Sequence, residues 1–371
     1  MNSDLISCLS QVTDPRTDKN KLYPLEEILL LCISGVVSGA DGWKSIAEFG
    51  RTKLNWLRKF LEFNNGIPSE DCIAWVMAKL SPSAFQECFV TWTESIAKLT
   101  NGEVVAIDGK TLRGSRDRCK GRSAIHMVSA WANENRLSLG QVAVDEKSNE
   151  ITAIPKLLKM LDIKGAIVTI DAMGCQKKIA EQIISQGADY ILAVKDNQPE
   201  LHDAIKDYFE IAKATDFRAT SVTDSEQVDT GHGRVEVRRC YLASDISTLP
   251  EPEKWTKLQS IALIESERHE GGKTTHESRY YITTVDGDAM KFSNAVRSHW
   301  GVENRLHWVL DVTFREDDCR IRRDNAPANF NTLRQFALNL IRRAKTGRSV
   351  KGSRLKAAWD DSFRYNILSH L

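Results

Sequence analysis

Two short apolar runs, each followed by an aspartate, constrain this chain more than any other feature. Val104–Ile107 precede Asp108, and Ile167–Ile170 precede Asp171. Both runs are rich in β-branched residues, which predicts buried strands of an open sheet. Ligands of such sheets bind at the carboxyl ends of strands. If the two strands are neighbours, their aspartates meet at one edge of the sheet.

A third carboxylate, Glu303, lies in a Trp- and His-rich segment that is predicted to be helical over Ser293–Leu310. His299, Glu303 and His307 are four residues apart in turn, so they share a helix face. Mg²⁺ prefers oxygen ligands and keeps open positions for substrate, so these three carboxylates predict a divalent-cation site for chemistry on phosphate. Each has an alternative role: the aspartates could form a turn or a helix cap, and the glutamate a surface salt bridge.

The composition allows about two or three globular domains and gives little global attraction for nucleic acid. The chain has 371 residues, of which 42% are hydrophobic, and a formal net charge of +1. Positive charge is concentrated locally, because Arg315–Lys356 contains twelve Lys or Arg against four acidic residues. That segment fits a solvated face and a phosphate-binding face equally well.

The cysteines and the apolar segments predict a protein of a reducing, intracellular compartment. The eight cysteines contain no C-x-x-C pair, and Met1–Asp4 does not start a signal peptide. The longest apolar run, Ile28–Val37, is about half the length of a membrane span. No membrane partner is expected.

The periodicity of apolar residues changes along the chain and predicts four regions. Residues 1–98 are predicted to form a helical domain, which is a candidate for binding DNA ends. Residues 99–214 follow the order β-β-β-α-β-α-β, which is typical of a mixed sheet with helices on its faces. Residues 215–288 are β-rich and polar, and residues 289–371 return to the helical period.

Two other chemistries are less consistent with the residues. Gly109-Lys110-Thr111 resembles the end of a phosphate-binding P-loop, but the glycine required five positions earlier is Val104. Catalytic zinc helices place two histidines four residues apart, whereas His299 and His307 are eight apart.

Four blocks of the chain resemble bacterial insertion-sequence transposases of the H-repeat-associated group, over about residues 10–345. The blocks are Ile107–Ser115, Asp145–Ile151, Thr169–Gln176 and His299–Trp308. The resemblance implies a DDE transposase of the α/β class, with a ribonuclease-H-like mixed-sheet core, an N-terminal helical domain and a β-rich insertion before the glutamate helix.

The resemblance also implies the chemistry. Asp108, Asp171 and Glu303 match the catalytic, metal-binding triad by position, with Mg²⁺ as cofactor and Mn²⁺ as a substitute. Asp108 would be the shared ligand of two ions. Hydrolysis would nick DNA at the element ends, and the freed 3′-OH would attack target DNA in the same site.

One signature of related transposases is missing. Its Tyr, Arg and Lys positions are occupied here by Val296, His299 and Leu310. Arg297, His299 and Arg305 are candidate substitutes for the phosphate contacts of that signature. Asp311 remains an alternative to Glu303 as the third ligand.

The expected partner is double-stranded DNA, both element ends and target, bound by a homodimer. The predicted DNA contacts near the strand ends and on the glutamate helix are Lys110, Arg113, Lys177, Lys195, Arg297 and Arg305. The turn containing His232 and Arg234 is a further candidate. Two alternatives stay open: a DNA-binding remnant of an element without turnover, and a metal-dependent nuclease without strand transfer.

Overall fold

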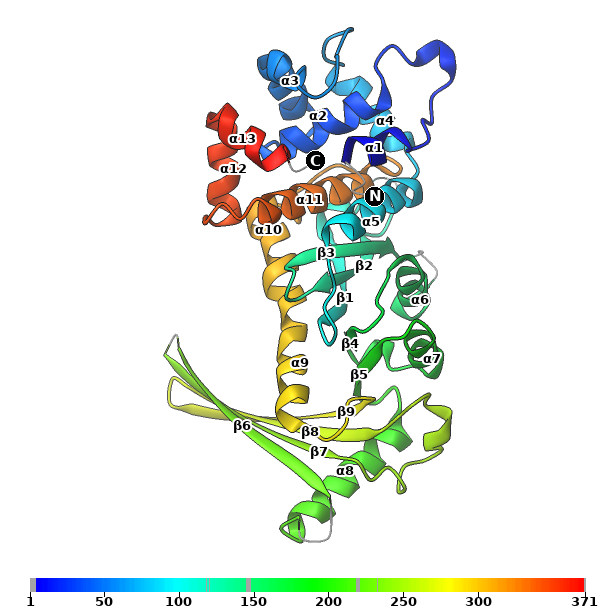
Figure 1. Cartoon of the computed structure of the whole chain (residues 1–371), viewed down its shortest axis with the longest axis vertical. Helices are drawn as coiled ribbons and strands as arrows, with labels where there is room; N and C mark the ends of the chain where they lie inside the picture. The colour runs from blue at the N-terminus through cyan, green and yellow to red at the C-terminus, as the bar shows by residue number, and fades with distance from the viewer. Residues whose placement is uncertain are drawn as a thin grey trace.

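The computed structural model describes residues 5–117, 119, 121–144, 148–217, 221–231 and 233–369. Figure 1 shows helices at one end of the molecule, a sheet flanked by helices in the middle and long antiparallel strands at the other end. The helical end combines both ends of the chain, because α11 packs against α2, α4 and α5. Its helices are α1 Leu5–Ser10, α2 Leu25–Val37, α3 Trp43–Leu57, α4 Glu70–Lys79, α5 Pro82–Ile96, α11 Ala326–Arg343, α12 Val350–Trp359 and α13 Asp361–Leu368.

One mixed sheet of nine strands has the order β3-β2-β1-β4-β5-β9-β8-β7-β6. The strands of its first half are β1 Val104–Leu112, β2 Ile125–Ala132, β3 Leu137–Ala143, β4 Ile167–Ile170 and β5 Asp189–Val194. β1, β2 and β3 are antiparallel, whereas β4 is parallel to both β1 and β5. The predicted α/β class with a mixed-sheet core is confirmed.

Helices cover both faces of this half of the sheet. α6 Glu150–Met160 and α7 Lys177–Ser185 connect β3 to β4 and β4 to β5 and lie on one face (Figure 1). On the other face, α9 Ala289–Gly301 packs against β1 and β4 and continues into α10 Trp308–Phe314. The carboxyl ends of β1 and β4 therefore face the last turns of α9.

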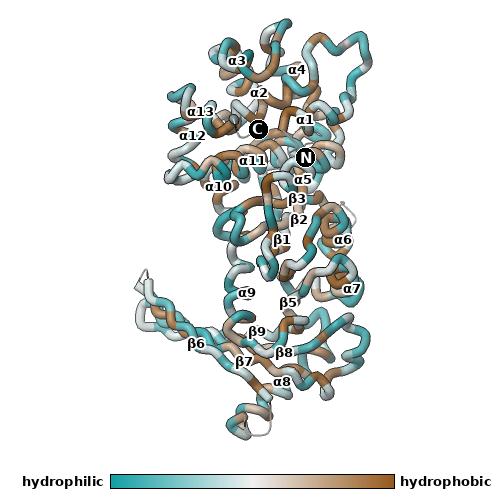
Figure 2. Tube along the Cα trace, in the orientation of Figure 1, coloured by the Kyte–Doolittle hydropathy of each residue, from teal (hydrophilic) through white to brown (hydrophobic). Residues whose placement is uncertain are grey.

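The remaining strands extend the same sheet instead of forming a separate one. They are β6 Val222–Gly231, β7 Arg234–Ala243, β8 Ser260–Glu270 and β9 Lys273–Thr283, and they follow α8 Pro199–Ala214. β9 pairs antiparallel with β5, with Ile191 opposite Thr283. The sequence did not predict β6, because its residues are mostly polar and do not alternate between polar and apolar. Figure 2 shows hydrophilic residues along β6.

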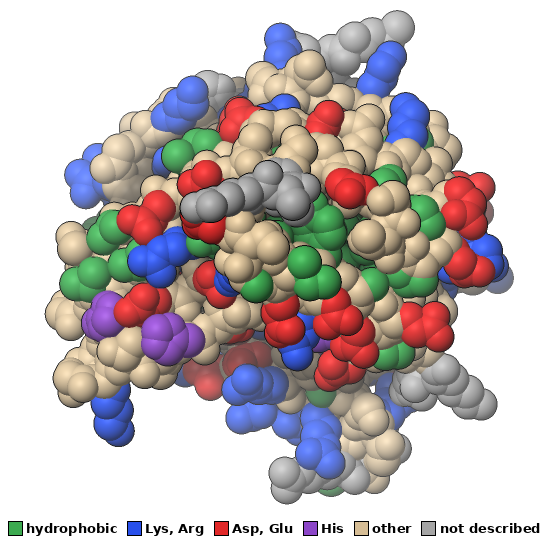
Figure 3. Space-filling model, turned by 90° about the horizontal axis from the view of Figure 1, so that it is seen from below, with side chains coloured by type: hydrophobic (Ala, Val, Ile, Leu, Met, Phe, Trp, Pro, Cys, Tyr) green, Lys and Arg blue, Asp and Glu red, His purple; other side chains and the backbone are tan. Residues whose placement is uncertain are grey.

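The face of the molecule seen in Figure 3 carries both signs of charge, in keeping with the net charge of +1. Within the described part of the chain, the helices are too short or too polar to cross a bilayer.

A buried polar contact fastens α11 to β3, the edge strand of the sheet. The Asn339 side chain accepts a hydrogen bond from the backbone N–H of Ser138 at 3.0 Å and donates one to its carbonyl at 2.8 Å. Gln335 accepts a bond from the Ser138 hydroxyl at 2.9 Å. Without these partners, the buried backbone groups of β3 would lose their hydrogen bonds.

Asn339→Ala should lower the free energy of unfolding by roughly 2–4 kcal/mol, because two buried backbone groups lose their partner. Urea denaturation measures the change. Asn366→Ala, at an exposed position on α13, is the matched control and should cost less than about 1 kcal/mol. Equal effects of the two substitutions would contradict a structural role for the Asn339 contact.

Candidate active site

The parallel pairing of β1 and β4 brings Asp108 and Asp171 together. Ile107 lies opposite Ile170, and each aspartate is the next residue of its chain segment. β4 ends there as predicted, but β1 continues to Leu112 because it pairs with β2, so Asp108 lies within its strand and not at its end. The Asp108 Oδ1 atom accepts a hydrogen bond from the backbone N–H of Gly109 at 2.9 Å. Asp171 accepts one from Met173 N at 3.1 Å, so it caps the short turn that follows β4 and still presents its carboxylate at the sheet edge.

Glu303 lies in a π-helical turn, Val302–His307, between α9 and α10. Such wider turns are rare in helices and often occur at functional sites. Here the turn places the Nδ1 atom of His307 3.0 Å from Glu303 Oε2 and 3.6 Å from Asp108 Oδ2. The two histidines of the predicted face with Glu303 therefore have different partners. His299 forms a hydrogen bond with Thr169 of β4 at 2.9 Å, and His307 lies between two carboxylates.

Asp108, Asp171 and Glu303 line one pocket of about 370 Å³. Thr169 and Tyr281 supply part of its wall, and the basic or aromatic side chains that line it are Lys195, Arg279, His299 and Trp300. The three predicted carboxylates, which are up to 195 positions apart in the sequence, are thus brought to one cavity.

The electrostatics of the pocket disfavour uncompensated negative charge. Burial raises the pKa of Asp108 to about 6; His307 and the Gly109 bond oppose this, whereas Asp171 and Glu303 add to it. Burial, followed by the charge of Glu150, also raises the pKa of Asp171. The bond from His307 lowers the pKa of Glu303.

A bound cation fits this arrangement, because it would relieve the repulsion between the carboxylates. Among the described residues, one ligand atom from each of Asp108, Glu303 and His307 lies within 4.8 Å of the others. Asp171 faces the same pocket from the next strand. The sequence predicted three oxygen donors but not the nitrogen donor, because only the π-helical turn brings His307 to Asp108.

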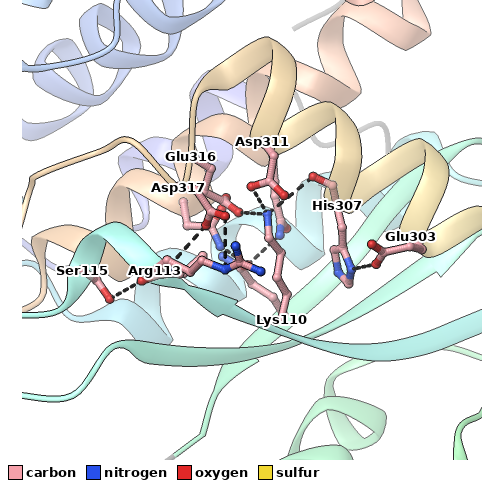
Figure 4. Close-up of polar contacts among 12 residues, drawn as sticks. Lys110, Arg113, Ser115, Glu303, His307, Asp311, Glu316 and Asp317 are labelled. Atoms are coloured by element: carbon pink, nitrogen blue, oxygen red, sulfur yellow. Dashed lines mark hydrogen bonds and ion pairs between the residues drawn. The ribbon is translucent and has the colours of Figure 1, made fainter.

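Asp311, the alternative third ligand, is bound to another partner. Lys110 of β1 reaches between Asp311 and Glu316 and lies 3.5 Å from the carbonyl oxygen of His307 (Figure 4). The Lys110 side chain is only 13% exposed. Although burial opposes its charge, Glu316 and Asp311 raise the pKa of Lys110. Lys110, predicted as a phosphate contact, is thus paired with protein carboxylates, the half-buried Asp311 of α10 and the buried Glu316, which fasten this segment to β1.

The other predicted DNA contacts lie at the surface. Lys195 lines the carboxylate pocket, Lys177 lies 3.3 Å from Glu251, and Arg113 is exposed, 3.6 Å from Asp317. The basic segment 315–356 is partly structural instead. Two of its arginines are buried over aromatic rings, at 4.5 Å for Arg334 on Phe330 and 4.3 Å for Arg354 on Phe314.

A second hollow, here named the arginine pocket, adjoins the first through Trp300, which lines both. It has a volume of about 480 Å³. Its cationic residues are Arg234, Arg238, Arg297 and Arg305. Asp229 and Glu236 pair with two of the arginines, Arg297 and Arg238, so the lining remains net positive. The sequence predicted Arg297, Arg305 and Arg234 as candidates but missed Arg238; His232 lies outside the described residues.

Comparison with known proteins identifies the family to which a chain with this sheet and this three-carboxylate pocket belongs. A family described as "Transposase DDE domain" matches residues 100–340, and one described as "DDE_Tnp_1-associated" matches residues 6–93. The chain belongs to the DDE transposase family.

Similar proteins occur in Escherichia coli. The H repeat-associated putative transposase YhhI of strain K12 is 42% identical, covering 98% of this chain and 97% of its own length. The putative transposase YncI of O157:H7 is 41% identical, covering 98% and 94%. A relative named inactive transposase YbfQ is 41% identical over 20% of this chain and 89% of its own length. The structure of a piggyBac transposase synaptic complex with hairpin DNA gives a TM-score of 0.44 at 13% identity, covering 98% of this chain and 78% of that chain.

Asp108→Asn should stabilise the metal-free protein at high pH. Because burial raises the pKa of Asp108 from 3.8 to about 6, the folded state disfavours the ionised form. The free-energy cost of the ionised Asp108 carboxylate in the folded state is absent below about pH 4, grows as the pH rises, and is complete above about pH 6. The asparagine variant should therefore gain roughly 2 kcal/mol at pH 8 in EDTA and less at pH 5.

Urea unfolding at the two pH values tests this expectation. Asp311→Asn is the contrasting variant, since it removes a partner of Lys110 and should lower stability at both pH values. A loss of stability in Asp108→Asn at pH 8 would show that the cost of burying the ionised carboxylate does not dominate at this position.

Proposed function

We propose that the chain is an active DNA transposase, which cleaves phosphodiester bonds at insertion-sequence ends and joins the freed 3′-OH to target DNA. The convergence of Asp108, Asp171 and Glu303 on one pocket carries this proposal. Family membership supports the transposase role. Retention of all three carboxylates favours an enzyme over an idle DNA-binding remnant.

Asp108 would be the ligand shared by two divalent ions, with Asp171 holding one and Glu303 the other. Mg²⁺ is the expected ion, and Mn²⁺ can substitute. Such ions lower the pKa of the attacking water or 3′-hydroxyl and stabilise the leaving oxygen. Burial and mutual repulsion of the carboxylates, seen in the raised pKa of Asp108, suit this site to divalent charge.

Other residues of the pocket would orient the DNA. Lys195 is exposed at the rim and can neutralise a phosphate next to the scissile bond. Burial lowers the pKa of His299 to about 4, so this ring stays neutral and supports β4 through Thr169. Arg279 lies over the Trp300 ring at 5.2 Å and keeps that exposed aromatic side chain at the border of the two pockets.

The arginine pocket would hold the DNA backbone beside the cleavage site. Its position next to Trp300 makes it continuous with the carboxylate pocket. Lys177 and Arg113 remain candidates for phosphate contacts farther out. Because transposition joins two element ends to one target, we expect at least a homodimer on DNA, acting in the cytoplasm at the nucleoid.

Cleavage of DNA that contains the borders of the gene should require Mg²⁺ and stop in EDTA. Asp171→Asn and Glu303→Gln should each lower the cleavage rate by about a thousandfold or more, since each removes a metal ligand. Asp311→Asn should retain cleavage. If Glu303→Gln cleaves and Asp311→Asn does not, the third ligand is Asp311. Joining of a pre-cut end to a target plasmid separates a transposase from a nuclease.

Replacing Arg234 and Arg305 together by Gln should weaken DNA binding and reduce its salt dependence, by about two in the slope of log K against log salt. Fluorescence anisotropy at several salt concentrations measures both quantities. The charge-matched control is Arg239→Gln with Arg268→Gln, which removes two arginines of β7 and β8 that do not line the pocket. Equal losses in both double variants would assign the effect to net charge alone.

A further inference from the structure

We propose that a nitrogen ligand, His307 Nδ1, completes one of the two divalent-ion positions together with Asp108 and Glu303. This inference rests on the proposed function, because it concerns the ions of the same site. It adds a ligand that the three-carboxylate assignment lacks and makes the two ion positions chemically different.

The distances match shared coordination. Ligands at adjacent positions around an octahedral ion, each about 2.1 Å from the metal, lie about 3 Å apart. His307 Nδ1 lies 3.0 Å from Glu303 Oε2 and 3.6 Å from Asp108 Oδ2. One donor atom from each of the three residues lies within 4.8 Å of the others. Small side-chain adjustments would bring all three to one ion.

The surroundings fix the donor atoms in this orientation. Gly109 N–H holds Asp108 Oδ1, which leaves Oδ2 facing His307. The His307 ring is 2% exposed, and the Lys110 ammonium lies 3.5 Å from its backbone carbonyl oxygen. Figure 4 shows the ring directed at the Glu303 carboxylate. A buried donor oriented in advance loses little conformational entropy when it binds an ion.

A proton relay is a weaker explanation of the same geometry. A relay would need the second ring nitrogen to reach another acceptor or solvent. His307 Nε2 is buried and has no hydrogen-bond partner within the described part of the chain. The ring therefore presents one functional nitrogen, and that nitrogen faces the two carboxylates.

A nitrogen ligand changes which ions the position prefers. All-oxygen sites suit Mg²⁺ and Ca²⁺, whereas imidazole favours transition metals such as Mn²⁺. Position one, formed by Asp108, Glu303 and His307, should therefore bind Mn²⁺ more tightly than position two, formed by Asp108 and Asp171.

Pulsed electron paramagnetic resonance on the full chain with Mn²⁺ tests the assignment directly, because a coordinated imidazole gives a ¹⁴N coupling. We expect this coupling in the unaltered protein and in His299→Gln, which changes the other histidine of the pocket. We expect its loss in His307→Gln, with Mn²⁺ affinity lowered about tenfold or more. The His307→Gln side chain can still donate to Glu303, so a purely positioning role would leave the affinity nearly unchanged.

The outcomes separate the two proposals. Bound Mn²⁺ without a ¹⁴N coupling, or a coupling that persists in His307→Gln, would overturn the nitrogen ligand and leave the three-carboxylate site intact. Failure of the unaltered protein to bind Mn²⁺ or Mg²⁺ at all would overturn the metal-dependent function itself. Loss of the coupling in His299→Gln alone would identify His299 as the nitrogen ligand and would overturn the assignment to His307.

Discussion

The parallel pairing of β1 with β4 holds two carboxylates side by side, and much of the surrounding structure offsets the electrostatic cost of that pairing. Asp108 is half-buried and Asp171 is more exposed, and desolvation in the protein raises the pKa of each. Glu303 adds a third negative group from the helix opposite. His307 partly compensates this charge from within the protein. The strand pairing thus brings negative charges together that a nearby positive charge would stabilise, which explains why the pocket is suited to cations.

The helix that delivers Glu303 is positioned by interactions on both sides of the site. On one side, His299 of α9 bonds Thr169 of β4. On the other, Lys110 of β1 binds Asp311 and Glu316 after the π-helical turn. Both contacts join this helix to the two strands that bear the aspartates. The relative positions of the three carboxylates are therefore determined by short side-chain links to one sheet.

The sequence predicted much of the core because its signals are local. The β-branched runs before Asp108 and Asp171 became β1 and β4, and the predicted order β-β-β-α-β-α-β is the order of β1 to β5 with α6 and α7. Proximity of Asp108 and Asp171 followed from the parallel pairing of the two runs, although β1 continues past Asp108 to Leu112. The membership of the family, predicted from four blocks of residues, is confirmed.

Features that depend on tertiary contacts could not be predicted in the same way. β6 has no alternating hydrophobic pattern, since it pairs only with β7 at the far edge of the sheet. The segment Ser293–Leu310 has an ordinary helical period, which gives no sign of the π-helical turn at Val302–His307. The partners of Lys110 are more than 200 positions away in the sequence. The charge pattern of the sequence likewise did not predict that Arg334 is buried over Phe330, whereas other arginines of the same segment lie at the surface.

The junction between β5 and β9 has a mechanical consequence. Because Ile191 pairs with Thr283 through the backbone, the long hairpins are an extension of the sheet that carries Asp108. Arg234 and Arg238 on β7 therefore belong to the same hydrogen-bonded sheet as that carboxylate. A DNA duplex bound by those arginines would be held in one position relative to the carboxylates. The paired β-strands would then determine which phosphodiester bond is cut.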